Sequence, residues 1–231
     1  KDKGRDVPVH VAGASVAMIA PFLDPDLDWD FRQDRVVSIN TSGHKYGLVY
    51  PGVGWVVWRD ASALPEELVF KVDYLGGEMP TFALNFSRPG AQVAAQYYNF
   101  LSLGFDGYHR VMHACRETAK WLAHQILRLG PFELVSEGDG IPAFAFRMKE
   151  GAGYSVFDVS DAIRSRGWLV PAYRMPPGME EMAVLRVVVR DDLSRDLAAR
   201  LVDDLRRVIE HLELRASGEP LAEKPRTGFH H

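Results

Sequence analysis

Strand-like runs and amphipathic helical stretches alternate along this chain, and that alternation constrains its fold more than any other feature. Short runs rich in β-branched and aromatic residues, such as 9–12, 36–39 and 54–59, are typical of strands, the first of them buried. Apolar residues spaced three and four apart predict helices over 91–103 and 107–129. The chain is therefore expected to be an α/β protein built on a layered sheet.

The second half of the chain continues the pattern with further strands and helices. A Ser155-x-x-Asp158 capping pattern predicts the start of a helix that extends to about Arg164. Strands are expected at 132–135, 143–148 and 184–189. A final helix is expected to place on one face Leu193, Leu197, Leu201, Leu205, Val208 and Leu212.

Changes in composition divide the chain into parts. The segment 69–81 contains Gly76, Gly77 and Pro80, and it predicts an irregular loop that is either a mobile lid or a plain surface connection. The expected parts are 1–110, which belongs to a larger sheet domain, 111–215, which forms a small α+β domain, and 216–231, which is a tail.

The sequence Ser42-Gly43-His44-Lys45 is the strongest candidate for chemistry, because it directly follows a predicted strand. A buried lysine is more easily deprotonated, and its neutral amine is the nucleophile that captures an aldehyde as a Schiff base. The Ser42 hydroxyl, the Gly43 amide and the His44 imidazole are suited to holding a phosphate. A lysine beside a phosphate cradle is typical of a pyridoxal-phosphate site, although most lysines are solvated surface charges.

Composition excludes several kinds of partner. The 27 basic and 31 acidic residues give a net charge of -4. The sequence contains no basic stripe with interleaved aromatic residues, so nucleic acid is not expected as a partner. Cys115 is the only cysteine, which excludes an intrachain disulfide and favours a reducing compartment. Neither a signal peptide nor an apolar run of membrane-spanning length is found, so a cytoplasmic protein without a membrane partner is expected. The histidines show no spacing typical of a metal site.

Blocks of sequence that occur in a fixed order indicate a family. They are Ser42 to Gly47, Gly54 to Arg59, Asp73 to Gly77, Thr81 to Pro89 and Leu185 to Arg190. On these blocks the chain resembles the carboxy-terminal half of pyridoxal-phosphate-dependent glutamate decarboxylases, which belong to the group II decarboxylases. The resemblance covers nearly the whole chain. It implies the carboxy-terminal part of the large domain of a fold-type I enzyme, followed by a small α+β domain.

The resemblance also implies roles for residues around the cofactor, pyridoxal 5'-phosphate. Lys45 would carry the Schiff base, Ser42 and His44 would bind the phosphate, and Ala14 would lie against the ring. Tyr74 would belong to a mobile loop and protonate the carbon that carbon dioxide leaves, which converts L-glutamate to 4-aminobutyrate.

Other implied roles lie further along the chain. Phe86 and Ser87 would reach the cofactor site of a neighbouring subunit, so the smallest active unit would be a dimer. Arg186 would meet a substrate carboxylate, for which a planar guanidinium offers two parallel donors. His231 matches the tail histidine that closes the site in bacterial relatives. The tail has too few basic residues for calmodulin binding.

The chain departs from the family pattern at one position that matters for chemistry. Ala12 stands where the family has an aspartate that pairs with the ring nitrogen, and Val16 and Ala17 replace glycines nearby. Loss of that charge is expected to weaken both cofactor binding and catalysis. The chain also lacks an initiator methionine and matches only half of such an enzyme, so we expect it to be incomplete as a catalyst and to expose an apolar sheet edge.

Two alternatives remain open at this point. The first is a non-catalytic paralogue or remnant that acts as a binding or oligomerisation module, which Ala12 favours and the intact Lys45 disfavours. The second is a decarboxylase of the same fold that acts on an aromatic amino acid, which the glutamate-type blocks disfavour.

Overall fold

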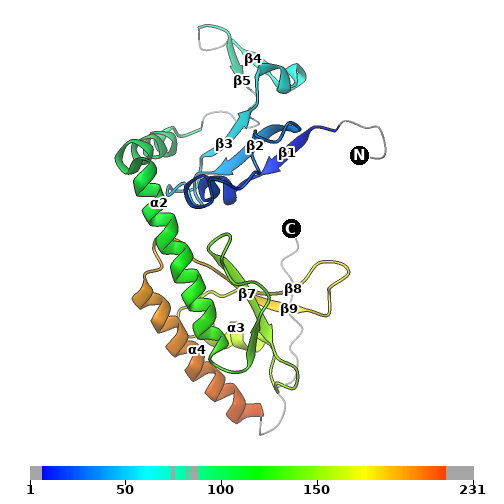
Figure 1. Cartoon of the computed structure of the whole chain (residues 1–231), viewed down its shortest axis with the longest axis vertical. Coiled ribbons are helices and arrows are strands. Elements are labelled where there is room, and N and C mark those ends of the chain that lie inside the picture. Colours follow the sequence, from blue (N-terminus) through cyan, green and yellow to red (C-terminus); the bar gives the residue numbers. More distant parts are fainter. Residues whose placement is uncertain (1–6, 74–75, 82, 84–87, 217–231) are drawn as a thin grey trace. The chain divides into compact units, whose positions relative to one another are not determined.

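The computed structural model describes residues 7–73, 76–81, 83 and 88–216 (Figure 1). The chain forms two compact units, which divide between Ala114 and Cys115. Each unit has its own sheet and its own buried core, and each is described below by itself.

The first unit is built on a three-stranded sheet with the order β1-β2-β3. Its strands are β1 (Val9–Ala12), β2 (Val36–Ser42) and β3 (Gly54–Trp58), as predicted to within a few residues. β1 runs parallel to β2, whereas β3 runs antiparallel to β2. The short helices of the unit are η1 (Val16–Met18), α1 (Ala20–Leu23), η2 (Ala61–Ala63) and η3 (Glu66–Leu68).

The prediction that the first strand is buried was wrong. Val9, His10 and Ala12 are exposed, and only Val11 is partly covered. β1 lies at the edge of the sheet, where among the described residues it pairs with β2 alone. A strand at the edge of a sheet has a neighbouring strand on one side only, so residues typical of a buried strand can be exposed there.

The segment expected to be an irregular loop contains a two-stranded antiparallel sheet. Its strands are β4 (Phe70–Val72) and β5 (Met79–Thr81). Pro80 pairs with Lys71 in this ladder. A proline is tolerated there because both strands of a two-stranded sheet are edges, so a missing N–H disrupts no second ladder.

The long helix α2 (Ala91–Leu127) begins in the first unit and ends in the second. At Gly104 its backbone leaves the helical region, with φ of 58° and ψ of -167°. This positive φ suits glycine, which has no Cβ to clash. The break separates the two predicted helices, and the second of them ends two residues earlier than expected.

The second unit contains an antiparallel sheet with the order β6-β7-β9-β8. Its strands are β6 (Phe132–Leu134), β7 (Ala143–Met148), β8 (Ala172–Arg174) and β9 (Ala183–Val188). β8 was not predicted, because three residues are too few to show an alternating pattern. α3 (Val156–Arg164) packs on β8 and β9 and against α4 (Arg195–Ala216), and Figure 1 shows both helices beside this sheet.

The start of α3 follows from local chemistry. α3 has the predicted capping box, in which the Ser155 side chain accepts from the Asp158 amide and the Asp158 carboxylate accepts from the Ser155 amide. In α4 the buried face runs from Ala198 to Leu212. The predicted face was wrong at its start, because Leu193 precedes the helix and Leu197 is exposed.

No helix among the described residues is both long and apolar enough to span a bilayer.

The raised pKa of the Cys115 thiol makes the free energy of unfolding depend on pH. This side chain is buried, and burial together with the nearby charges of Asp191 and Asp192 raises its pKa to about 11. The unfolded chain ionises this thiol near its ordinary value, so between about pH 9 and 11 the folded state holds more protons than the unfolded state. The contribution of Cys115 to the free energy of unfolding is therefore present below this range and decreases by about 3 kcal/mol across it.

Urea denaturation of the natural chain and a Cys115→Ala variant at a series of pH values checks this expectation. The difference between their free energies of unfolding should shrink above pH 9. A constant difference would contradict the raised pKa.

Candidate functional site

A tight turn follows β2 and carries three of the predicted site residues. The Lys45 amide donates to the Ser42 carbonyl at 3.3 Å, which closes the turn around Gly43 and His44. The Gly43 amide donates to the Val53 carbonyl at 3.1 Å, so the turn is also fixed to the segment before β3. Ser42, His44 and Lys45 are all half-buried.

The loop after β1 lies against this turn. The Ser42 amide donates to the Ala14 carbonyl at 3.1 Å. One step earlier, the Gly13 amide donates to Oδ1 of Asn40 at 3.1 Å. Because β1 and β2 are parallel, their carboxyl ends lie at the same end of the sheet. Ligands of α/β proteins bind at this end of the strands. The structure thus brings Ala14, Ser42 and the Lys45 turn together.

Two glycines allow the turn to be this compact. A Cβ on Gly43 would lie 2.5 Å from Cγ1 of Val53, and a Cβ on Gly47 would lie 2.6 Å from the Gly43 carbonyl oxygen. Real Cβ atoms do not approach other atoms this closely, so both positions exclude a side chain. Leu48 then adopts a φ of 64°, which is uncommon for any residue other than glycine.

The donors on this turn suit an aldehyde that carries a phosphate. The Lys45 amine makes no hydrogen bond or ion pair with any residue that the structure describes. The Ser42 hydroxyl and the His44 imidazole lie within three residues of that amine, and such groups bind phosphate oxygens. The Gly43 amide, which was also predicted to hold the phosphate, already donates to the Val53 carbonyl. The turn therefore fits covalent capture of an aldehyde beside an anion.

The end of β1, two residues before Ala14, fits a bound cofactor less well. Ala12 ends β1, is exposed, and pairs with Asn40 across the sheet. Its methyl group carries no charge, and the side-chain oxygen Oδ1 of Asn40 already accepts from the Gly13 amide. No carboxylate therefore stands at this position to pair with a basic ring nitrogen.

The remaining predicted site residues lie either outside the described residues or in the second unit. Tyr74, Phe86, Ser87 and His231 lie outside the described residues. Arg186 belongs to the second unit, where it lies on β9 and is exposed. Its guanidinium carbon lies 5.6 Å from the centre of the Tyr173 ring, which is a cation–π contact.

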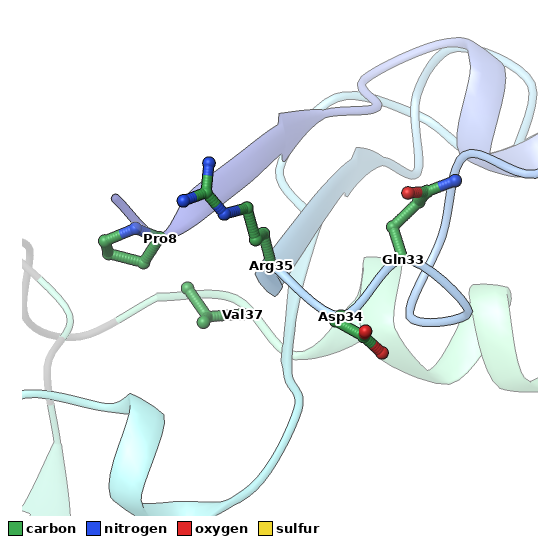
Figure 2. A pocket seen from close by; sticks show the side chains of 5 residues that line it. All are labelled: Pro8, Gln33, Asp34, Arg35 and Val37. Carbon is green, nitrogen blue, oxygen red and sulfur yellow. The ribbon is translucent and has the colours of Figure 1, made fainter. Parts of the chain in front are cut away.

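A pocket of about 530 Å³ lies in the first unit but at the other end of the strands. Figure 2 shows its lining side chains, which come from the residue before β1, from the segment that leads into β2 and from the start of β2. They are Pro8, Gln33, Asp34, Arg35 and Val37. These are the amino ends of the two strands, whereas Lys45 follows the carboxyl end of β2, so the pocket is not the candidate site.

Sequence reasoning missed three residues of α2 that contact the segment after Lys45. Gln96 and Tyr108 both bond to the Gly47 carbonyl, and Asn99 donates to the Leu48 carbonyl at 2.8 Å. Gln96 is fully buried, which is unusual for glutamine. A buried polar residue in an otherwise amphipathic helix gives no periodic signal, so only the folded structure identifies it.

Comparison with known proteins places the chain in a family. Residues 2–149 match the pyridoxal-dependent decarboxylase conserved domain. The chain therefore belongs to the pyridoxal-dependent decarboxylase family, as the sequence blocks predicted.

Glutamate decarboxylases are among its relatives within this family. The chain is 53% identical to the glutamate decarboxylase of Aliivibrio fischeri and 48% identical to that of Solanum lycopersicum, in both cases over all of its own length. It spans 50% and 48% of those two proteins, so it covers about half the length of the curated relatives that it matches.

Solved structures confirm the fold class. The glutamate decarboxylase of Lactobacillus brevis matches 90% of this chain with a TM-score of 0.86 and 45% identity, and 47% of that chain is covered. A sphingosine-1-phosphate lyase of Burkholderia pseudomallei matches 92% of this chain with a TM-score of 0.72 and 29% identity, and again 47% of that chain is covered. The predicted α/β fold, part of a fold-type I enzyme, is confirmed.

The packing around Gly43 gives a test of the turn. A Gly43→Ala substitution forces Val53 or Gln96 to move, because the new Cβ would lie 2.5 Å and 2.8 Å from their side-chain atoms. Overpacking of this kind is expected to lower the free energy of unfolding by about 1–3 kcal/mol.

Gly54→Ala is the matched control, since its Cβ would meet nothing closer than the Thr41 carbonyl oxygen at 3.6 Å. Urea denaturation of both variants measures the difference. Equal stability of the two variants would show that the turn is looser than the structure indicates.

Proposed function

We propose that this chain provides the lysine and the phosphate-binding turn of a pyridoxal-phosphate-dependent glutamate decarboxylase, which converts L-glutamate to 4-aminobutyrate and carbon dioxide. The observation that carries the proposal is the turn Ser42 to Lys45, fixed between the Ala14 carbonyl and the Val53 carbonyl at the carboxyl edge of parallel strands. The identity of about half of all residues to glutamate decarboxylases supports the choice of substrate.

The residues of the turn divide the work of holding the cofactor. The Lys45 amine makes the covalent attachment, and the turn fixes the backbone from which it extends. The Ser42 hydroxyl and the His44 imidazole bind the phosphate, and Ala14 leaves space for a flat ring beside them. When bound, pyridoxal phosphate supplies an electron sink for the bond that breaks as carbon dioxide leaves.

Two further residues complete the proposed chemistry. Tyr74 donates the proton that replaces the lost carboxylate on the same carbon, so one proton is taken up for each carbon dioxide released. Arg186 binds a substrate carboxylate. Its exposed guanidinium is held by the Tyr173 ring through a cation–π contact, which leaves its N–H groups available to the substrate.

The proposal includes an assembly and a place in the cell. Phe86 and Ser87 contribute to the cofactor site of a second subunit, so the active protein is at least a dimer, and His231 closes the site near neutral pH. A cytoplasmic location agrees with the single cysteine, Cys115, which is free and buried.

Ala12 favours a second candidate function, which is a non-catalytic binding or oligomerisation module of the same family. Without a carboxylate at this position, a ring nitrogen loses the charge that favours its protonated form. Attachment of the cofactor at Lys45 would then persist while turnover is slow.

Chemical trapping tests the proposed role of Lys45. We expect borohydride reduction of the chain with pyridoxal phosphate to place a stable label on Lys45, and a Lys45→Arg variant to lose that label. Lys71→Arg is the matched control, because Lys71 is exposed and paired with Glu78 at 3.0 Å. Peptide mass spectrometry measures the label, and an even distribution over all lysines would exclude a specific site.

The Ala12→Asp variant separates the two candidate functions. A restored carboxylate is expected to tighten pyridoxal phosphate binding by about tenfold or more, because a charge-assisted hydrogen bond contributes about 1.5 kcal/mol or more. Ala12→Asn, which is similar in shape but neutral, should give a smaller gain. Spectroscopic titration gives the affinity, and 4-aminobutyrate release gives the rate. Turnover that rises with Ala12→Asp supports the decarboxylase, whereas an affinity for pyridoxal phosphate that Ala12→Asp leaves unchanged favours the binding module.

A further inference from the structure

Gln96 belongs to α2 and is fully buried, and its side chain packs against the residues that follow the Lys45 turn. Both hydrogens of its amide are used, since Nε2 donates to the Gly47 carbonyl at 2.8 Å and to the Tyr108 hydroxyl at 3.0 Å. The Tyr108 hydroxyl in turn donates to the same Gly47 carbonyl at 3.0 Å. The three groups form a closed triangle that uses both lone pairs of one backbone oxygen, two residues after Lys45.

The other end of the Gln96 amide fills the centre of the turn. A Cβ on Gly43 would lie 2.8 Å from Oε1 of Gln96, and a Cβ on Gly47 would lie 2.5 Å from it. The amide oxygen thus occupies space that side chains at positions 43 and 47 would need, on either side of Lys45 in the sequence. It accepts no hydrogen bond from any described residue, and a buried acceptor without a partner costs stability.

Tyr108 is held rigidly, so it gives the triangle a fixed base. Its ring is buried, stacks on Phe22 with centroids 5.1 Å apart, and contacts Phe100 at 5.8 Å. Burial raises the pKa of its phenol, which keeps the hydroxyl protonated and able to donate. The ring belongs to the core cluster of the first unit together with Tyr46, the residue directly after Lys45.

We propose that Gln96 and Tyr108 are positioning residues for Lys45, which hold the turn so that the lysine amine meets the cofactor aldehyde at a fixed place. Neither residue touches the reacting atoms, and both act through the Gly47 carbonyl. This inference rests on the proposed function of Lys45. A displacement of about 1 Å at a reacting group costs up to about a hundredfold in rate, so small movements of the turn are sufficient for a large effect.

The test is the rate at which borohydride traps pyridoxal phosphate on Lys45 in the whole 231-residue chain. Gln96→Met keeps the size of the side chain but removes its amide, and Tyr108→Phe keeps the ring but removes the hydroxyl. We expect each change to slow the labelling of Lys45 by about tenfold, and the double variant to slow it by more than either.

Gln92→Met is the matched control. Gln92 precedes Gln96 by one helical turn and also has a buried amide oxygen, but its side chain contacts Gly52 rather than the Lys45 turn. We expect this variant to label Lys45 at the natural rate. Thermal unfolding of every variant shows which of them fold, and Tyr108→Phe decides the question if Gln96→Met does not fold.

The outcomes separate this inference from the proposed function. Natural labelling rates in folded Gln96→Met and Tyr108→Phe chains would overturn the positioning role and leave the role of Lys45 intact. Rates that fall with the melting temperature in every variant, Gln92→Met included, would show a purely structural role and also overturn the inference. A natural chain that shows no selective label on Lys45 would overturn both proposals.

Discussion

The parallel pairing of β1 with β2 is the interaction on which the candidate site depends. It places the two loops at the carboxyl ends of these strands at one edge of the sheet, where the Ser42 amide reaches the Ala14 carbonyl. The turn that carries Lys45 is then fixed on three sides by backbone bonds, by close packing at two glycines and by polar side chains of α2. Nothing in this arrangement relies on the flexible lysine side chain itself. The backbone provides the order, and the amine stays free to react.

The turn also shows how stability is exchanged for a defined geometry. A fully buried glutamine with an unpaired oxygen is less favourable than an apolar residue of the same size, and a leucine with positive φ adds strain. Both features adjoin Lys45. Gln96 bonds to the carbonyl of Gly47, two residues after Lys45, and Leu48 is the next residue along the chain. Strain and buried polar groups that gather beside a nucleophile are typical of sites that must be held in one conformation.

Much of this fold could be predicted from the sequence, because the long helices and the main strands have clear periodicity and the Ser155 capping pattern is local. The residues of β1 do not by themselves show whether the strand is buried, since exposure depends on which strands lie beside it. The β4–β5 pair escaped because glycine and proline hid two three-residue strands. In the site, the motif identified Ser42, His44 and Lys45, but the roles of Gln96 and Tyr108 depend on contacts 49 and 61 residues apart in sequence. No local pattern encodes such contacts.

The most direct measurement of the central claim compares pyridoxal phosphate with pyridoxal, which has the aldehyde and the ring but lacks the phosphate. Absorbance titration of the chain with each compound gives the number of binding sites and the affinity. The account predicts saturable covalent binding of the phosphorylated compound at one site per chain, much tighter than that of pyridoxal, because Ser42 and His44 hold the phosphate. Equal, non-saturating reaction with both compounds would contradict it, since that is the behaviour of ordinary surface lysines.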